Sequence, residues 1–220
     1  MTRRHRMAVL VLALLAAVPA WPQGPGPGDI QLPAPRTSGG RPLFEVLKER
    51  RSARDFGEQQ VPDQVLADLL WAAWGINRPD DGKRTAPSAR NWQEIDVYVV
   101  RATGAYRYAA EHNRLVSVAQ GDLRPLAGSQ GYVATAPLNL VYVADTARMK
   151  GSSTEDQPLY MGADTGFISQ NVYLFCASEG LATVVRAMVD REALGRALGL
   201  SPQQRITLAQ TVGYPAKPAR

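Results

Sequence analysis

The sequence predicts an α+β domain, and two observations carry that prediction. Apolar segments at helical spacing and β-branched segments follow one another irregularly along residues 42–220, whereas a doubly wound sheet would alternate them. No Gly-x-Gly-x-x-Gly or Walker loop is present, so the glycine-rich nucleotide sites of such sheets are not indicated. The chain has 220 residues, enough for one domain of ordinary size once a leader is set aside.

The first 20 residues have the pattern of a secretory signal. A basic stretch (2–6) precedes an apolar stretch (7–18), which is shorter than the ~20 residues of a membrane span. We therefore expect an exported, periplasmic protein, and Arg3-Arg4 leaves the twin-arginine route open as a minority alternative. Residues 21–41 are rich in Gly and Pro and predict a disordered linker, followed by one domain over 42–220.

Charge and cysteine content exclude several classes of function. Removing residues 1–20 removes three arginines and leaves 22 basic against 20 acidic side chains, so no nucleic-acid partner is indicated. Cys176 is the only cysteine, which rules out an internal disulfide, and its apolar neighbours predict a buried thiol. Since His5 and His112 are the only histidines, we expect no metal site and no Cys/His or Ser/His/Asp hydrolase.

The first half of the domain predicts two helices and a strand. A short amphipathic segment (42–49) comes first. Pro62-Asp63 opens a second helix, in which apolar residues keep helical spacing to Trp74 until Gly75 ends it. Residues 77–91 are polar and turn-rich, hence a loop, and 95–101 is a β-branched buried strand.

The second half predicts a hairpin, two strands and two helices. The hairpin joins 106–108 to 115–118, and 136–144 is a core strand. A long buried helix follows at 166–181, and a short one at 190–198 ends at Gly199. The 201–204 segment resembles a capping box, although a strand at 206–212 follows it closely.

The run Arg50-Arg51-Ser52-Ala53-Arg54 is the strongest local indication of a ligand. Guanidinium groups bind phosphates and carbonyls in a planar, bidentate manner, and a hydroxyl adds a further hydrogen bond. A basic helix end, which complements the helix dipole, is the alternative interpretation. Elsewhere we expect Trp71 and Trp74 to pack in the core or an interface, and Lys83 and Arg84 to be solvated loop charges.

Four motifs in order resemble those of the nitroreductase family, homodimeric flavoproteins that bind FMN at the subunit interface. They are the arginine cluster, the segment 87–93 (PSARNWQ), the segment 164–171 with 180–183 at the end of its helix, and Gly213-Tyr214-Pro215. The resemblance extends from about Pro42 to the C-terminus. It implies a nitroreductase-like fold, with a central, mostly antiparallel sheet flanked by helices.

The resemblance also implies which residues hold FMN. Arg50, Arg51 and Ser52 would bind the phosphate and ribityl chain, and Arg54 would face the pyrimidine edge of the ring. Ser88 and Asn91 would line the ring, and Gln170 would support the dimer interface. The segment that contains Arg186, Ala187 and Met188 would pass the ring face, with a backbone N–H near flavin N5, although relatives often have Pro and Gly there. Lys217 and Arg220 would supply late phosphate contacts.

The implied activity is ping-pong hydride transfer through flavin N5 to or from a small organic substrate, with no catalytic side chain. NAD(P)H is the usual donor in the family, but it is scarce outside the cytoplasm, so another donor is an alternative. Two other functions remain open. One is a non-catalytic flavin-binding or electron-shuttle module. The other is a flavin-dependent dehydrogenase of a peptide or heterocycle, because the 106–116 hairpin is similar to that of azoline oxidases.

Overall fold

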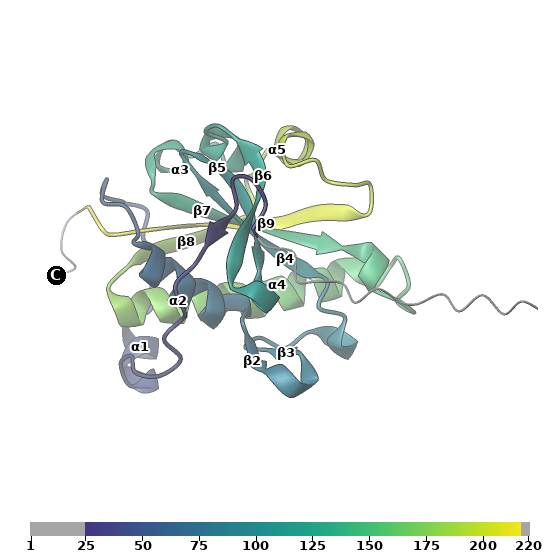
Figure 1. The fold of residues 1–220 in the computed structure, drawn as a ribbon, viewed down its shortest axis with the longest axis horizontal. Coiled ribbons are helices and arrows are strands. Elements are labelled where there is room, and N and C mark those ends of the chain that lie inside the picture. Colours follow the sequence, from purple (N-terminus) through teal and green to yellow (C-terminus); the bar gives the residue numbers. More distant parts are fainter. Residues whose placement is uncertain (1–24, 217–220) are drawn as a thin grey trace, which may run out of the picture.

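The fold is an antiparallel sheet with helices on both faces (Figure 1). The computed structural model describes residues 25–216, and seven of its strands form one sheet in the order β1-β6-β5-β4-β7-β9-β8. Each neighbouring pair is antiparallel. The strands are β1 (Ile30–Gln31), β4 (Ile95–Arg101), β5 (Gly104–Ala109), β6 (Arg114–Gln120), β7 (Leu138–Asp145), β8 (Ala182–Arg186) and β9 (Gln204–Gly213), with β2 (Ile76–Arg78) and β3 (Lys83–Arg84) in a separate hairpin. The predicted α+β class and mostly antiparallel sheet are confirmed.

Helices cover the sheet from both sides (Figure 1). On one face lie α1 (Leu43–Glu49), α2 (Asp63–Trp74) and the long α4 (Gln157–Glu179); on the other lie α3 (Gly131–Thr135) and α5 (Arg191–Ala197). The 3-10 turns are η1 (Pro79–Asp81), η2 (Ala89–Asn91), η3 (Ala110–His112), η4 (Arg124–Ala127) and η5 (Thr146–Arg148). Among residues 25–216, no helix is long and apolar enough to cross a membrane.

The central strands are mostly apolar because each of their faces packs in a core. In β4, Val97 and Val99 join the core formed with α2 and α4. Tyr98 and Val100, the alternate residues, join a second core with α3 and α5. Successive strand residues point to opposite faces, so a strand covered on both sides has no polar face to display.

The predicted strands and helices correspond to observed ones, but α4 is longer than expected. It begins at Gln157 with Pro158 in its first turn, nine residues before the predicted start at Gly166. The intervening residues include exposed Gly162 and Ala163. Because that turn of the helix leaves one face uncovered in this chain, it lacks the apolar spacing by which a buried helix is recognised.

Two local predictions near the C-terminus require correction. β8, directly after Gly180, was not predicted, and it pairs with β9 at the edge of the sheet. Ser201 and Gln204 do bond to each other, since Ser201 N donates to Gln204 Oε1 at 3.0 Å. Gln204 then starts β9 rather than a helix, so the motif closes a turn.

The prediction of a disordered linker over 21–41 is wrong for residues 30–36, which the structure shows packed against the domain. β1 pairs with β6, and Leu32 is buried. Arg36 donates to the Asp68 carboxylate from both its backbone N and its Nε, each at 2.7 Å. Composition alone missed these contacts because a few apolar and charged anchors are enough to dock a Gly/Pro-rich segment.

Candidate functional site

The arginine cluster lies between the ends of α1 and α4 and the start of β8. α1 ends at Glu49, and Ala53 N donates to Thr183 O at 2.9 Å. This backbone bond places residues 50–54 alongside β8. The cluster therefore occupies a wall formed by three elements that are distant in sequence.

Tyr173 on α4 joins the parts of this wall, which we call the arginine wall and which consists of residues 50–54, Tyr173 and the start of β8. Its hydroxyl accepts a hydrogen bond from Val185 N at 3.0 Å and lies 2.8 Å from Ser52 Oγ. A phenol that accepts from an amide still has its own proton to donate, so it can donate to Ser52. The Arg50 guanidinium lies 5.2 Å from the ring centroid, in cation–π contact. Sequence reasoning did not select Tyr173, because an aromatic residue inside an apolar helix reads as packing.

A cavity of about 720 Å³ opens beside this wall. Its lining includes Arg50, Arg51, Ala53, Tyr173, Thr183 and Pro215. The volume is within the range of about 300–1,000 Å³ that small-molecule sites occupy. The structure thus brings Arg50 and Arg51 to one cavity, with Ser52 held at its wall, whereas Arg54 is exposed and does not line it.

The charges around this cavity favour an anionic ligand. Within residues 25–216, Arg50, Arg51 and Arg54 make no ion pair, whereas Arg41 and Arg124 are each paired with a carboxylate. Glu49 also lines the cavity, but it is paired with Arg41. Guanidinium groups held together without an ion pair of their own are suited to bidentate binding of phosphate or carboxylate.

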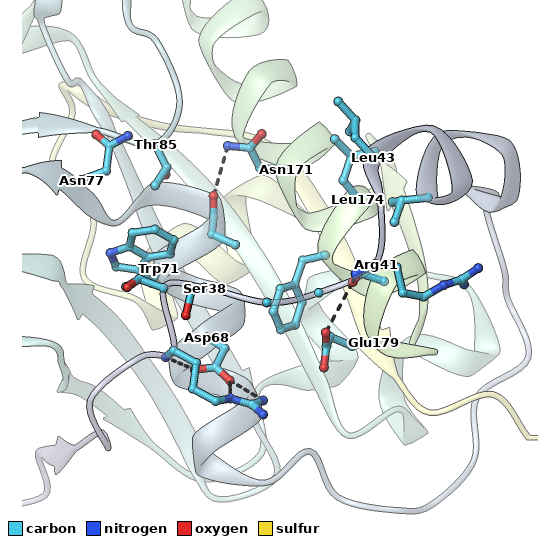
Figure 2. Close-up of a pocket in the computed structure, with 18 residues that line it drawn as sticks. Ser38, Arg41, Leu43, Asp68, Trp71, Asn77, Thr85, Asn171, Leu174 and Glu179 are labelled. Atoms are coloured by element: carbon cyan, nitrogen blue, oxygen red, sulfur yellow. Dashed lines mark hydrogen bonds and ion pairs between the residues drawn. The ribbon is translucent and has the colours of Figure 1, made fainter.

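A second cavity, of about 590 Å³, lies between the 36–41 segment, α2 and α4 (Figure 2). Trp71, Leu174 and Phe175 supply apolar walls. Its two arginines are both engaged, Arg36 with Asp68 and Arg41 with Glu49. Because these cations are already neutralised, the first cavity is the better candidate for an anionic group.

The loop before β4 carries Ser88 and Asn91 in a strained backbone. Arg90, Asn91 and Gln93 have φ of 49°, 54° and 49°, in the left-handed region that residues other than Gly rarely adopt. Ser88 Oγ accepts from Gln93 N at 2.8 Å and donates to Glu94 Oε2 at 3.2 Å. Such strain persists only where surrounding contacts enforce it, and it is common at functional sites.

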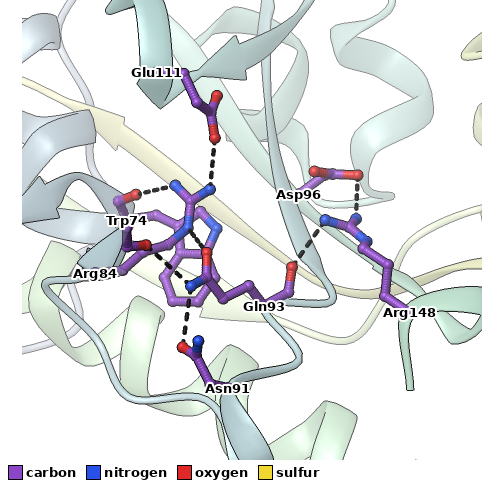
Figure 3. A network of polar contacts seen from close by, with 8 residues as sticks. Trp74, Arg84, Asn91, Gln93, Asp96, Glu111 and Arg148 are labelled. Carbon is purple, nitrogen blue, oxygen red and sulfur yellow. Dashed lines mark hydrogen bonds and ion pairs between the residues drawn. The ribbon is translucent and has the colours of Figure 1, made fainter. Parts of the chain in front are cut away.

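Arg84 supplies much of that enforcement (Figure 3). It donates to Gln93 Oε1 at 2.7 Å, to Trp74 O at 2.9 Å and to Glu111 Oε1 at 2.9 Å. Its guanidinium also lies 4.9 Å from the Trp74 ring. The expectation of a solvated Arg84 is wrong, because the end of α2 offers both a free carbonyl and an aromatic face. Asn91 Oδ1, in turn, accepts from Gln93 Nε2 at 3.0 Å.

Two buried carboxylates lie beneath this loop. Glu94 is 0% exposed and Asp164, on α4, is 2% exposed. Asp164 Oδ2 accepts from Ala89 N at 2.9 Å, and Glu94 is within hydrogen-bonding reach of Asp164. Burial, reinforced by the negative charge of Asp164, raises the pKa of Glu94 to about 7.

In one chain, the arginine wall and the 87–93 loop lie at different positions along α4. The wall is anchored at Tyr173 and the loop at Asp164. These residues are nine positions apart on one helix, which corresponds to about 13 Å along its axis. The residues predicted to bind the phosphate and those predicted to line the ring therefore lie at two separate places in one chain, which we call the two half-sites of the predicted site.

The predicted 186–188 contacts divide into a buried side chain and an exposed segment. Arg186 donates to Thr211 Oγ1 at 2.6 Å, to Ala127 O at 2.9 Å and to Asn139 Oδ1 at 2.8 Å. Burial lowers its pKa to about 10. Its side chain thus belongs to the core, and only the backbone here is available to a ligand. Ala187 and Met188 are exposed, and Lys217 and Arg220 lie outside the described residues.

Comparison with protein families gives one match that covers most of the chain. The model of the Nitroreductase family matches residues 47–214. A nitroreductase-family protein of Methanocaldococcus jannaschii is 32% identical over 161 residues, which cover 68% of this chain and 81% of that protein.

Solved structures show the same fold. A nitroreductase-family structure from Ralstonia eutropha has a TM-score of 0.82 and 40% identity, over 86% of this chain and 90% of that one. One from Desulfovibrio desulfuricans, in complex with FMN, has a TM-score of 0.58 and 23% identity, over 83% and 91%. A chain of the Escherichia coli microcin synthetase McbBCD complex has a TM-score of 0.65 and 18% identity, over 80% and 75%. The last two likenesses concern the fold.

Proposed function

Since this chain belongs to the nitroreductase family, we propose that it is an exported, FMN-dependent oxidoreductase that acts on a small organic molecule as a homodimer. The single observation that carries the proposal is the cluster of unpaired arginines at the 720 Å³ cavity. A phosphate-bearing cofactor matches both the charge and the size of that cavity, so the residues present fit FMN.

In this proposal, Arg50 and Arg51 bind the phosphate and Ser52, held by Tyr173, adds a hydroxyl to it. Arg54 lies beyond the cavity and is assigned to the pyrimidine edge of the ring. A cation there stabilises negative charge that grows on reduction. FMN, when bound, would supply hydride transfer at N5. The backbone of 185–188 is the part of this chain that we assign to the N5 side.

We propose the homodimer because the half-sites are separate and α4 leaves an apolar face uncovered. Leu159 is 69% and Phe167 47% exposed, and they share that face with Gly162, Gly166 and Gln170. Glycine inside a helix costs about 1 kcal/mol relative to alanine, yet it allows close approach of another helix. Antiparallel packing of α4 against a second α4 would bring the 87–93 loop of one copy to the arginine wall of the other.

Exposed apolar residues on α1 extend the same proposed interface. They are Leu43, Phe44 and Leu47, and Phe44 is 85% exposed. Contiguous exposed apolar surface of this kind is typical of protein interfaces. Leu43 also lines the 590 Å³ cavity, together with Leu174 on α4, so we assign that cavity to the edge of the dimer contact.

Export and the electron donor remain part of the proposal. The leader over residues 1–20 supports a periplasmic location, where NAD(P)H is scarce. We therefore propose that donor and acceptor enter the same cleft in turn, giving ping-pong kinetics, with NAD(P)H as only one candidate donor. The alternative donors are another small reductant, or a reduced substrate that the enzyme itself oxidises while it passes the electrons to oxygen or a quinone.

Two alternative functions are each supported by one observation. A flavin-binding electron shuttle is favoured by the 185–188 segment, in which Val185, Ala187 and Met188 stand where relatives often have Pro and Gly. A dehydrogenase of a peptide or heterocycle is favoured by the fold likeness to the microcin synthetase chain. Bound flavin without turnover would select the shuttle, and oxidation of an azoline-containing peptide would select the dehydrogenase.

The deciding experiment is the absorbance spectrum of purified residues 21–220, with identification of the extracted cofactor and anaerobic addition of NADH and NADPH. We expect bound FMN. Colourless protein that does not bind added FMN would refute the proposal. Arg50→Ala should weaken FMN binding, whereas Arg196→Ala, which removes an exposed partner of Glu192 on α5, should not.

The homodimer has its own measurement, light scattering after gel filtration. Phe167→Glu should give monomers with weakened FMN binding, because each site would lose its second half. Ala102→Glu places the same charge on the exposed β4–β5 turn and should leave the dimer intact. Wild-type monomers that bind FMN fully would refute the shared site.

A further inference from the structure

The buried pair Glu94 and Asp164 has no cation to neutralise it. Within residues 25–216, neither carboxylate forms an ion pair, and Arg148 bonds instead to residues on either side of Glu94 in the sequence. That arginine is directed to Gln93 O at 2.8 Å and to Asp96 at 2.5 Å. Two ionised carboxylates without a partner would be costly to bury, since desolvation and mutual repulsion act together.

Hydrogen-bond accounting points to one proton held by the pair. Glu94 Oε2 accepts from Ser88 Oγ, and Asp164 Oδ2 accepts from Ala89 N. Glu94 Oε1 is buried and accepts no hydrogen bond from any group within residues 25–216. Asp164 lies within reach, but an ionised carboxylate can only accept. A proton between the two carboxyl groups satisfies this oxygen and removes one of the two charges.

The pair is connected to the ligand-facing loop through Ser88. Ser88 is half-buried, whereas Glu94 is fully buried. The Ser88 hydroxyl, which donates to Glu94, therefore lies between the pair and the surface of the loop. Ser88 is also the residue that we assign to the ring side of the cofactor. The 87–93 loop is strained, and two adjacent residues near its start, Ser88 and Ala89, donate directly to Glu94 and Asp164 respectively.

We propose that Glu94 and Asp164 share one proton, and that Glu94 is a positioning residue which supplies this proton to the acceptor through the Ser88 hydroxyl. The proposal rests on the proposed reductase function. An acceptor such as a quinone takes a hydride, that is two electrons and one proton, from the reduced cofactor and becomes an anion. It then needs one further proton, which the buried pair is placed to supply through Ser88.

The Ser88 O–H bond breaks as its proton goes to the anionic acceptor, and the Glu94 O–H bond breaks as its proton replaces it on Ser88 Oγ. The terminal carboxyl torsion of glutamate is soft, so Glu94 can turn its protonated oxygen toward Ser88. Both carboxylates are then ionised, and one proton from water restores the pair when the product leaves.

The first test examines proton sharing without cofactor or turnover. Infrared spectra of FMN-free protein, recorded against pH, should show one protonated carboxyl band that is lost as pH rises through about 7. Glu94→Gln should abolish this band, and Glu155→Gln, which changes an exposed carboxylate, should leave it unchanged. A wild-type protein without such a band well below that pH would overturn the proposal.

The second test measures the oxidative half-reaction of FMN-loaded protein that has been reduced by light. Reoxidation by menadione should slow by at least about 10²-fold in Glu94→Gln, the contribution expected of a positioned proton donor. Asp164→Asn should move the pH dependence to lower pH, because the charge that favours a protonated Glu94 is gone. Glutamine keeps the size and the acceptor for Ser88, so FMN affinity should not change.

The outcomes separate this inference from the proposed function. If Glu94→Gln is reoxidised at the wild-type rate and with the wild-type pH profile, the proton-supply role is refuted while the reductase function stands. A wild-type protein that binds FMN but reacts with neither quinone nor nitro acceptors would refute the function and, with it, the supply role. The infrared result would then decide proton sharing alone.

Discussion

Replacing Tyr173 by Phe removes one hydroxyl that joins α4, the arginine segment and β8. Val185 N loses its acceptor and Ser52 loses its partner, while the ring beneath Arg50 remains. A lost hydrogen bond that leaves a partly buried amide without a partner costs about 1–2 kcal/mol. For a domain of this size, that free energy corresponds to a fall in Tm of about 2–8 °C.

The same substitution should weaken FMN binding, because Ser52 is no longer held toward the cavity. A loss of about 1 kcal/mol would raise the Kd roughly fivefold. The assays are thermal unfolding of FMN-free protein and fluorescence titration with FMN. Tyr106→Phe is the matched control, since it removes a hydroxyl that contacts Thr103 at 3.3 Å, away from the arginine wall.

Two results would contradict this reasoning. Unchanged stability in Tyr173→Phe would mean that water replaces the hydroxyl without cost. Unchanged FMN affinity, together with lowered stability, would mean that the cavity beside Tyr173 does not hold the phosphate end. Equal effects of Tyr173→Phe and Tyr106→Phe on FMN binding would also remove the specific role of this wall.

Three other predictions concern charge, packing and pH. Arg54→Ala should lower the flavin midpoint potential, measured by dye equilibration, because a cation that favours the reduced form is lost. Gly128→Ala should destabilise the fold by about 1–3 kcal/mol in urea unfolding, since its Cβ would meet Arg186 Nε at 2.5 Å, whereas Gly131→Ala, with nothing within 4 Å, should not. The pKa of Glu94 is raised to about 7 from 4.5, so its protonation stabilises the folded state below about pH 4.5, and this contribution is lost as pH rises to 7. The unfolding free energy of wild type relative to Glu94→Gln should therefore decrease across that window by on the order of 3 kcal/mol, and a flat difference would refute the shift.

Sequence patterns identified the helices and strands that a single local signal defines, such as a hydrophobic pattern or a helix cap. β4 over Ile95–Arg101 matches its predicted bounds because β-branched residues fill both faces of a covered strand. α2 ends at Trp74, just before Gly75, as its cap predicted. β8 was missed because five residues directly after a long helix carry too little periodicity of their own, and they are a strand only through β9.

The candidate site divides in the same way. Arg50, Arg51 and Ser52 were selected as candidates because a dense cation cluster is visible in the sequence whatever the fold. Tyr173 was not selected, because its role depends on the two groups that its hydroxyl contacts. These are Ser52 Oγ and Val185 N, which lie 121 and 12 residues away in the sequence. Arg186 looks like a ligand contact in sequence but turns inward, because Asn139 and Thr211 supply neutral acceptors in the core.

The sequence by itself determined the class of fold, the cluster of cations and the family resemblance, because each depends on residue types at short range. Only the tertiary structure decided which cations remain unpaired, that the arginine wall and the 87–93 loop lie apart in one chain, and that Glu94 lies close to Asp164. The physical reason is that pairing, burial and proton sharing depend on which distant groups meet. Those meetings are set by the packing of α4 against the sheet, which no local pattern encodes.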